Sequence, residues 1–329
     1  MSKIINVILS GGVGSRLWPL SRKKKPKQYL SIFDQKSLFE HTYERNRKIA
    51  VKSLLIGSVD NINLAKEILD TSKYERLVES VPRNTAAAIA FAAFYADPED
   101  ILIVTPSDHL VDLEEEYKKS IEKGIEFAKE GFIVTFGIQP TYPETGYGYI
   151  EYEGNDVLAF REKPNTETAK SFLKKGGFLW NSGIFCFQAK VFLSELEKYE
   201  EKVFITAKEA FEKREGEIIP EELSLKIPSI SVDYAVMERS KKIKVVPSEY
   251  AWSDMGSYEA LYAYLLEKGH PVDENGNMYI GEEKKVKFLG MRDTILVSTQ
   301  DAMLVLDKDS SQSVKEVYEE IERLYPDLS

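Results

Sequence analysis

The sequence predicts an α/β protein built around a mixed sheet. In the first part of the chain, short apolar runs of strand length alternate with amphipathic stretches of helical spacing, which is typical of α/β architecture. After about Gly131, short apolar runs with aromatic interruptions dominate, which favours additional antiparallel strands. With 329 residues, of which 43% are apolar, the chain is long enough for a sizeable core and for roughly two domains.

Three apolar runs before Gly131 are expected to be buried strands, and two other stretches of this part have helical spacing. The expected strands are 4–9, 54–56 and 101–104, and the expected helices are 64–69 and 117–128. Asn84 is placed to cap an alanine-rich helix that starts near Thr85, because its side chain can accept a hydrogen bond from a free backbone N–H.

The second part of the chain is expected to add strands first and helices later. The expected strands are 132–137, 147–152, 157–160 and 184–187, and the expected helices are 189–199 and 257–266. A boundary at 269–271 divides the chain into predicted domains 1–268 and 269–329. The second domain is expected to hold strands 278–281, 294–298 and 302–306 and an amphipathic helix, 313–324.

Composition excludes several classes of function. The formal charge of −10 argues against nonspecific binding of nucleic acid, which needs a broad basic surface. The longest apolar run, 86–96, is shorter than the ~18 residues needed to cross a membrane, and residues 1–6 lack the apolar stretch of a secretory signal. The single cysteine, Cys186, excludes an intrachain disulfide and a cysteine zinc cluster, and a cytoplasmic location is expected.

The most informative segment is a glycine-rich loop that directly follows the first expected strand. It begins after Leu9 and contains Gly11, Gly12, Gly14, Ser15 and Arg16. Glycine permits a positive φ and lets backbone N–H groups approach an anion closely. The loop lacks the Gly-Lys-Ser/Thr of a Walker motif and the last glycine or alanine of the dinucleotide motif. A phosphate cradle and a plain turn between strand and helix both remain open at this point.

A basic segment after the glycines favours the phosphate interpretation. Six cations lie within twelve residues of an acidic protein: Arg16, Arg22, Lys23, Lys24, Lys25 and Lys27. A solvated charge run explains Lys23, Lys24 and Lys25. Arg16 and Lys27 instead flank two prolines that stiffen the loop, and fixed cations suit a triphosphate whose charge grows as pyrophosphate leaves.

Two acidic residues are candidate ligands for Mg²⁺. Asp108 lies just after the expected strand 101–104, at the sheet edge where the glycine loop also begins, and Asp254 comes from a distant segment. Two such carboxylates can hold Mg²⁺ while phosphate oxygens fill its other positions. Each aspartate could equally cap a helix or turn. A histidine-rich metal site is not expected, because the chain has only three histidines.

Together these motifs closely resemble the sugar-phosphate nucleotidyltransferases, and among them the mannose-1-phosphate guanylyltransferases. The resemblance covers nearly the whole chain, in segments 11–21 with 26–28, 83–86, 106–109, 145–150, 160–164, 180–185, 231–238, 252–257, 301–305 and 312–315. It implies a Rossmann-like catalytic domain, then a short left-handed β-helix with a terminal helix. It also implies a homodimer, for which 269–329 is a candidate dimerisation region. Longer relatives carry an added isomerase domain, but isomerase activity is not expected here, because His270 is the only histidine after Asp254.

The resemblance implies the transfer of GMP from GTP to α-D-mannose 1-phosphate, giving GDP-mannose and pyrophosphate with the help of Mg²⁺. It assigns catalysis to Arg16, Lys27 and Lys163, and the metal to Asp108 and Asp254. Nucleotide binding is assigned to Leu9, Gly11, Gly12, Gly14, Ser15, Arg16, Lys27 and Asp108 and, facing guanine, to Arg83, Asn84 and Thr85. Sugar-phosphate binding is assigned to Gly146, Glu162, Lys163 and Asn181.

Three alternatives stay open at this level. A transferase for another nucleotide or sugar, such as a glucose-1-phosphate thymidylyltransferase, would share most of these motifs. A noncatalytic regulatory subunit could share the scaffold, since fold alone does not fix function. A metal-dependent glycosyltransferase would use a sugar nucleotide as its donor.

Overall fold

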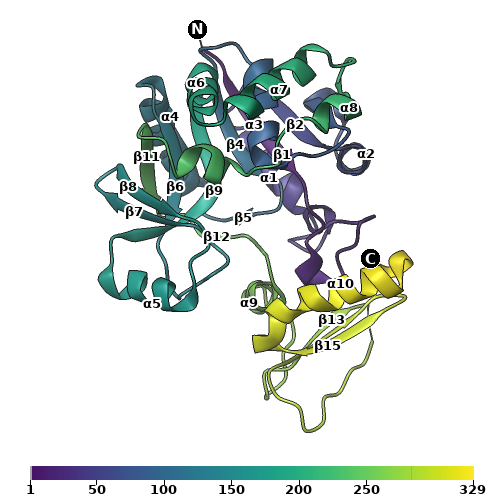
Figure 1. Ribbon diagram of the computed structural model, residues 1–329. Coiled ribbons are helices and arrows are strands. Elements are labelled where there is room, and N and C mark those ends of the chain that lie inside the picture. The colour runs from purple at the N-terminus through teal and green to yellow at the C-terminus, as the bar shows by residue number, and fades with distance from the viewer. Residues whose placement is uncertain (1, 283) are drawn as a thin grey trace. The chain divides into compact units, whose positions relative to one another are not determined.

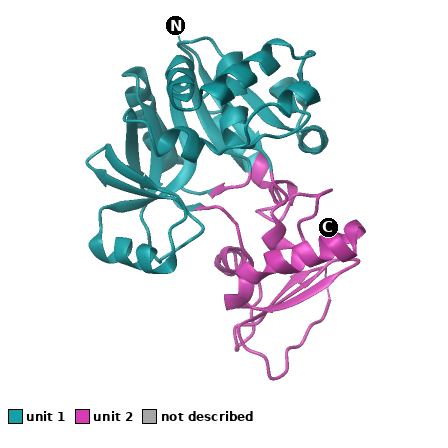
Figure 2. Cartoon of the chain, viewed as in Figure 1, with its two compact units in different colours: residues 1–11, 40–107, 111–252 teal, residues 12–39, 108–110, 253–329 magenta. Residues whose placement is uncertain are grey.

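The computed structural model describes residues 2–282 and 284–329 of the chain (Figure 1). By their internal contacts these residues form two compact units, shown in different colours in Figure 2. Unit 1 comprises residues up to 11, 40–107 and 111–252, and unit 2 comprises 12–39, 108–110 and 253–329. The glycine-rich loop thus groups with the C-terminal residues, a grouping that the boundary near residue 268 does not express. The predicted division of the sequence into 1–268 and 269–329 stays a prediction.

Unit 1 is built on a ten-stranded mixed sheet with the strand order β10-β3-β2-β1-β4-β9-β6-β11-β8-β7. Its strands are β1 (Ile4–Ser10), β2 (Lys52–Ser58), β3 (Glu75–Glu79), β4 (Ile101–Pro106), β6 (Ile133–Ile138), β7 (Tyr149–Glu153), β8 (Asp156–Arg161), β9 (Phe178–Gln188), β10 (Ile218–Ile219) and β11 (Ile243–Ser248). Strands β3, β2, β1 and β4 run parallel to one another, and β9 pairs antiparallel with both β4 and β6. The predicted mixed sheet is therefore confirmed.

Helices cover both faces of this sheet. They are α1 (Leu38–Asn46), α2 (Val59–Ile68), α3 (Asn84–Tyr95), α4 (Glu114–Lys129), α5 (Thr166–Lys175), α6 (Ala189–Tyr199), α7 (Glu201–Glu212) and the short α8 (Glu221–Ser224). Helices α3, α6 and α7 pack on one another, whereas α4 packs on β6, β9 and β11 (Figure 1). On β4, Leu102 and Val104 belong to one core cluster and Ile101 and Ile103 to another. Burial on both faces explains why this strand is an unbroken apolar run.

Polar side chains fix where several helices begin. Ser58 accepts a hydrogen bond from the backbone of Asn61 at the start of α2, and Asn165 accepts one from Thr168 at the start of α5. Helix α3 begins at Asn84 itself, whose side chain accepts from the backbone N–H of Thr85 at 2.8 Å. The residue in the capping position is Arg83, which makes no side-chain capping bond. The prediction that Asn84 caps this helix was therefore wrong by one position.

Strands β1 and β4 end at one edge of the sheet and so set the start of two functional loops. Leu9 is opposite Pro106, and the backbone N–H of Ser107 donates to the Leu9 carbonyl at 3.0 Å. Parallel strands place the segments that follow them at the same edge, where α/β folds bind ligands. The loop at Gly11 and the segment at Asp108 therefore both leave the sheet at this edge, as the sequence predicted.

Unit 2 contains the glycine-rich loop from Gly12 onward, helices α9 (Tyr258–Glu267) and α10 (Val314–Leu324), and a three-stranded sheet. The strands are β13 (Met278–Gly281), β14 (Thr294–Ser298) and β15 (Met303–Asp307). β13 and β14 run parallel, whereas β14 and β15 run antiparallel. The short strands β5 (Leu110–Val111) and β12 (Trp252–Ser253) include points where the chain passes between the units.

Two aromatic residues attach the glycine-rich loop to the rest of unit 2. Tyr258, fully buried at the start of α9, donates its hydroxyl to the carbonyls of Leu17 and Trp18 at 2.9 and 3.0 Å. The indole N–H of Trp18 donates to the carbonyl of Leu328 at 2.8 Å. The segment that follows the glycines is therefore hydrogen-bonded both to α9 and to the C-terminal residues of the chain.

Most expected elements are present with shifted ends, and several were missed. The strands expected at 278–281 and 294–298 and the helix at 189–199 have the predicted limits. Helices α1, α5 and α7 and strands β3 and β11 were not predicted, because charged residues interrupt their apolar positions. Among the described residues, no helix is both long enough and apolar enough to cross a bilayer.

Candidate active site

The glycine-rich loop is shaped by positive φ angles. Gly12 and Gly14 have φ values of 76° and 77°, a region that side chains disfavour. The turn closes through hydrogen bonds from the N–H of Leu17 to Gly14 O (2.9 Å) and from Ser21 Oγ to Gly14 O (2.6 Å). A Cβ atom added at Gly11 or Gly12 would meet nothing within 4 Å. The backbone at Gly11 and Gly12 therefore faces open space in the direction in which a Cβ atom would point.

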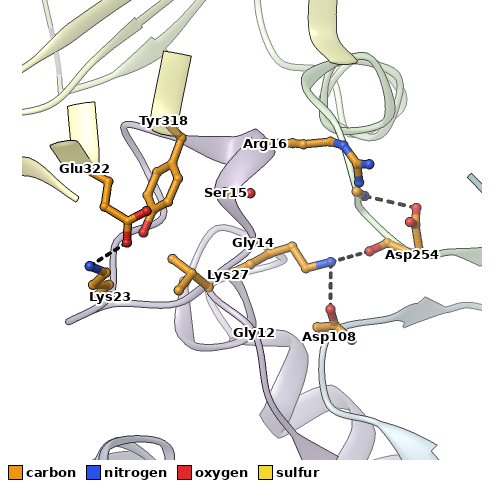
Figure 3. A pocket seen from close by; sticks show the side chains of 12 residues that line it. Gly12, Gly14, Ser15, Arg16, Lys23, Lys27, Asp108, Asp254, Tyr318 and Glu322 are labelled. Carbon is orange, nitrogen blue, oxygen red and sulfur yellow. Dashed lines mark hydrogen bonds and ion pairs between the residues drawn. The ribbon is translucent and has the colours of Figure 1, made fainter. Parts of the chain in front are cut away.

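The loop lines a cavity of about 480 Å³ that lies entirely within unit 2 (Figure 3). This cavity brings together seven of the predicted site residues: Gly12, Gly14, Ser15, Arg16, Lys27, Asp108 and Asp254. The other lining residues are Val13, Lys23, Gly256, Tyr318 and Glu322. Segments far apart in the sequence thus form one polar site, with the glycines on one wall.

Lys27 is a fixed and buried cation at the centre of this site. It is 5% exposed and lies in a 3-10 turn (Lys27–Tyr29) that follows Pro26. Its Nζ is 2.9 Å from Oδ2 of Asp108 and donates to the backbone carbonyl of Asp254 at 2.5 Å (Figure 3). A Cβ atom at Gly14 would collide with the Cβ of Lys27, so glycine at this position allows the lysine stem to pass. Arg16 lies on the turn Ser15–Leu17 and lines the same cavity.

The electrostatics of Asp108 favour its ionised form. Burial alone would raise the pKa of this carboxyl, but the charges of Lys27 and His109 and a hydrogen bond from Lys27 outweigh burial and lower the pKa. His109 Nε2 is 3.7 Å from the other carboxylate oxygen. Asp108 is therefore a carboxylate at neutral pH, as a metal ligand must be.

The donor set fits Mg²⁺ only when phosphate completes it. Asp108 and Asp254 supply carboxylates to one cavity, and one oxygen of Asp254 already accepts from the N–H of Gly256 at 3.0 Å. Among residues 2–282 and 284–329, no group of three or more His, Cys, Asp or Glu side chains could hold a metal. Mg²⁺ typically takes one or two carboxylates together with substrate phosphates and water. The chemistry of the two aspartates is consistent with that mode.

A second cluster lies in unit 1 and joins three of the predicted sugar-site residues. Lys163 Nζ is 2.9 Å from Oε1 of Glu162, whose side chain is 9% exposed. The amide of Asn181 is fixed, because its oxygen accepts from Thr135 Oγ1 at 3.0 Å and its nitrogen donates to Oδ1 of Asp233 at 3.3 Å. The positions of Glu162, Lys163 and Asn181 therefore agree with a shared site.

Sequence reasoning missed two members of this cluster, Gly148 and Asp233. A Cβ atom at Gly148 would lie 2.5 Å from Oε2 of Glu162 and 3.4 Å from the Cβ of Asn181, so glycine makes room for both. Gly146, which was predicted, is exposed, and its N–H donates to Glu144 at 2.7 Å. Both missed residues lie inside quoted motifs, 145–150 and 231–238, which was the available signal.

The pKa values of Asp233 and Lys163 in this cluster are both raised. Burial, reinforced by the charge of Glu162, raises the pKa of Asp233 to about 6. For Lys163, burial would lower the pKa, but the hydrogen bond and charge of Glu162 outweigh it and raise the pKa. Near neutral pH the cluster therefore contains a protonated lysine beside Glu162, and the ionised form of Asp233 is disfavoured by burial and by the charge of Glu162.

The residues predicted to face guanine make structural contacts in unit 1. Arg83 Nε donates to the Ile227 carbonyl at 2.7 Å, and Thr85 Oγ1 accepts from the N–H of Val232 at 2.9 Å. Asn84 has a positive φ of 69°. These bonds fix the segment between β3 and α3, and its contact with a base stays a prediction. Leu9 lies near the end of β1, and its carbonyl accepts from Ser107.

Comparison with known proteins identifies the family of the chain. The nucleotidyl transferase family model matches residues 5–268, and a mannose-phosphate isomerase/GMP-like β-helix domain matches residues 271–321. A mannose-1-phosphate guanylyltransferase of Klebsiella pneumoniae is 35% identical over 350 residues, covering 96% of this chain and 73% of that protein.

Two solved structures are also similar. The first, described as a mannose-1-phosphate geranyltransferase from Thermus thermophilus, has a TM-score of 0.84 at 30% identity and covers 97% of this chain and 99% of that one. The second, described as a mannose-6-phosphate isomerase from Helicobacter pylori, has a TM-score of 0.69 at 39% identity and covers 76% of this chain and 99% of that one. The family match spans most of the chain and includes every residue of the cavity except Tyr318 and Glu322. The chain therefore belongs to the nucleotidyl transferase family of enzymes.

Proposed function

We propose that the chain transfers GMP from GTP to mannose 1-phosphate, releasing pyrophosphate and forming GDP-mannose. The observation that carries this proposal is the cavity of unit 2, where an open glycine backbone lies beside buried Lys27 and two aspartates. The similarity to proteins known as mannose-1-phosphate guanylyltransferases supports the choice of GTP and mannose 1-phosphate.

In this reaction an oxygen of the sugar phosphate attacks the α-phosphorus of GTP in line, and pyrophosphate leaves. The attacking oxygen is already anionic, so the protein needs no general base. Its task is to bring two polyanions together and to neutralise their repulsion. Two like unit charges at ~4 Å repel by about 4 kcal/mol at an effective dielectric constant of 20, and each ligand carries several charges.

The groups of the cavity suit the triphosphate. The backbone N–H groups of the loop, from Gly11 to Ser15, can donate to phosphate oxygens on the open side of the glycines. Arg16 would clamp the leaving β- and γ-phosphates, and Lys27 would stabilise the α-phosphate or the leaving group. Because Lys27 is already held by Asp108 and by the carbonyl of Asp254, its position is set before the ligand arrives.

Asp108 and Asp254 would hold Mg²⁺, which supplies charge neutralisation and alignment of the phosphates when bound. The lowered pKa of Asp108 keeps this carboxyl ionised for that purpose. Lys27 shares Asp108 with the expected cation, so the site combines a permanent positive charge with an exchangeable one.

The cluster of unit 1 suits the sugar phosphate. Lys163, with its raised pKa, would bind the phosphate of mannose 1-phosphate. Glu162 would accept hydrogen bonds from hydroxyls of the sugar ring, and the amide of Asn181 would also hydrogen-bond to the ring. Arg83, Asn84 and Thr85 would read the edge of guanine. Gly146 would contribute its backbone to sugar binding.

The decisive experiment measures pyrophosphate release from a panel of nucleoside triphosphates and sugar 1-phosphates. Fastest release with GTP and mannose 1-phosphate supports the proposal. A preference for dTTP and glucose 1-phosphate would instead identify a thymidylyltransferase. No release with any pair would favour a regulatory subunit, and sugar transfer from a sugar nucleotide would indicate a glycosyltransferase. Because one similar structure is described as an isomerase, interconversion of mannose 6-phosphate and fructose 6-phosphate belongs in the same assay series.

We also propose a homodimer and a cytoplasmic location. The homodimer rests on the family resemblance, and light scattering of the purified chain tests it. The single cysteine, Cys186, is buried, which is compatible with a reducing compartment. Localisation of the tagged chain in its own cell tests the second proposal.

A further inference from the structure

One wall of the unit 2 cavity comes from the C-terminal helix α10 and carries an ion pair at the mouth of the site. Lys23 Nζ is 2.7 Å from Oε1 of Glu322, and the two side chains are 51% and 43% exposed (Figure 3). Sequence reasoning treated Lys23, Lys24 and Lys25 alike, as a solvated charge run. The structure separates them, because Lys23 lines the cavity whereas Lys24 and Lys25 do not.

The backbone of this region is firmly held, so the ion pair is not an accident of a loose loop. The N–H of Lys23 donates to the carbonyl of Ser329 at 3.3 Å. Arg22 forms an ion pair with Asp301 at 2.7 Å, which fixes the preceding residue. The half-exposed side chain of Lys23 can therefore change partners while the backbone around it stays in place.

A buried hydroxyl points to a ligand at the same place. Tyr318 on α10 is 6% exposed, and within the described part of the chain its hydroxyl has no hydrogen-bond partner. The side chain of Ser329 is close enough to lower the pKa of Tyr318, and its own hydroxyl donates to the carbonyl of Pro326 at 2.8 Å, but Tyr318 makes no hydrogen bond of ordinary geometry to it. The Tyr318 ring extends from α10 toward the glycine loop, with its hydroxyl beside Glu322 (Figure 3). Burial, together with the charge of Glu322, raises the pKa of Tyr318, so the hydroxyl is a donor at neutral pH.

The charges of the cavity show why Lys23 would exchange Glu322 for a phosphate as its partner. Its charged lining consists of three cations, Arg16, Lys23 and Lys27, and three carboxylates, Asp108, Asp254 and Glu322. Two of the carboxylates are the proposed metal ligands. Glu322 has no such role, and it places a negative charge in the wall of a cavity that an anion is proposed to occupy. A half-exposed ion pair contributes little stability, whereas a lysine bound to phosphate makes a stronger charge-assisted bond.

We propose that Lys23 and Tyr318 form an additional subsite for the terminal phosphates of the nucleoside triphosphate and for the pyrophosphate product. Without ligand, Lys23 is paired with Glu322, and a bound phosphate replaces Glu322 as the partner of Lys23. This inference rests on the proposed function of the cavity. Its chemical content is specific: a lysine and a tyrosine hydroxyl, supplied from outside the glycine loop, bind a phosphate or diphosphate. Glu322 acts as a competitor for Lys23 and weakens phosphate binding.

The test is a binding titration, because it needs no turnover. Inorganic pyrophosphate with Mg²⁺ is titrated calorimetrically into the whole chain and into Lys23→Gln, Tyr318→Phe, Glu322→Gln and Lys24→Gln. Lys24→Gln is the matched control, since it removes the same charge from the neighbouring residue outside the cavity. We expect Lys23→Gln to raise Kd about 5- to 20-fold and Tyr318→Phe to raise it about 3-fold, as the loss of a charged and of a neutral hydrogen bond predicts. Glu322→Gln should lower Kd by about 2- to 5-fold, the effect expected of one exposed ion pair.

Several outcomes would overturn the inference. A Kd for Lys23→Gln within twofold of the parent would show that Lys23 does not bind pyrophosphate. An equal loss of affinity in Lys24→Gln would show only a general charge effect. Weaker binding by Glu322→Gln would show that Glu322 assists the phosphate and does not compete for Lys23. Lys23→Arg should restore most of the affinity, which separates a charge effect from a folding defect.

Turnover separates this inference from the proposed reaction. In an active enzyme, Lys23→Gln should raise KM for GTP and leave KM for mannose 1-phosphate unchanged. Should the substrate panel show no pyrophosphate release while Lys23→Gln still weakens pyrophosphate binding, the reaction is refuted and the subsite stands. Normal release with unchanged pyrophosphate affinity in Lys23→Gln refutes the subsite and leaves the reaction intact.

Discussion

Alanine substitutions at three glycines of the glycine-rich loop should have increasing effects on stability, which tests the geometry of the loop. An alanine at Gly11 adds a methyl group with no neighbour within 4 Å and no positive φ. At Gly12 the added methyl also has no neighbour, but φ is +76°. At Gly14 φ is +77°, and the new Cβ would collide with the Cβ of Lys27, which is the fixed base of the side chain and not its flexible end.

These differences translate into different stabilities. A side chain in the left-handed region costs roughly 1–2 kcal/mol, and overpacking adds about 1–3 kcal/mol. The free energy of unfolding should therefore be unchanged in Gly11→Ala, lower by ~1–2 kcal/mol in Gly12→Ala and lower by ~2–5 kcal/mol in Gly14→Ala. Denaturant unfolding of the three variants beside the parent measures this order directly.

Activity should follow a different order, which makes the series informative. In Gly11→Ala and Gly12→Ala the methyl group stands in the open space that the triphosphate is proposed to fill, so KM for GTP should rise in both. A Gly11→Ala variant with parental stability and lower GTP affinity would separate phosphate binding from folding. Equal stability of Gly12→Ala and Gly14→Ala would refute the argued collision with Lys27. Full activity of Gly11→Ala and Gly12→Ala would refute the phosphate cradle.

Three further predictions concern the sugar site, the metal and a buried carboxyl. Lys163→Ala should raise KM for mannose 1-phosphate more than KM for GTP, and an unchanged affinity for the sugar phosphate would count against the role of Lys163. Asp254→Ala should abolish Mg²⁺-dependent turnover, and retained activity would remove Asp254 from the metal site. Burial raises the pKa of Glu79 to about 7 from an ordinary 4.5, so the parent should lose stability as pH rises from 4.5 through 7. Glu79→Gln should remove this loss, worth ~3 kcal/mol above pH 7, and a parental stability that is flat over that range would contradict the argument.

Much of the fold was predictable because a strand that is buried on both faces has a continuous run of apolar residues in its sequence. The apolar runs that became β1, β2 and β4 are buried on two sides, so their pattern needs no knowledge of neighbours. The edge shared by Gly11 and Asp108 followed from parallel pairing of β1 and β4. Helices α5 and α7 were missed because they carry many charges and bury only part of their surface.

The glycine-rich loop, its flanking cations and the order of motifs that places the chain in its family can all be identified from the amino-acid sequence. The partners of these groups become known only from the folded chain: Lys27 bonds to a carbonyl 227 residues away, Asp233 contacts Asn181, and Lys23 pairs with a residue of helix α10. Glycine conformation and apolar burial act within a few residues and so leave a local pattern. Ion pairs and buried hydroxyls between distant segments leave none, because charge and polarity alone do not say which partner the fold will bring near.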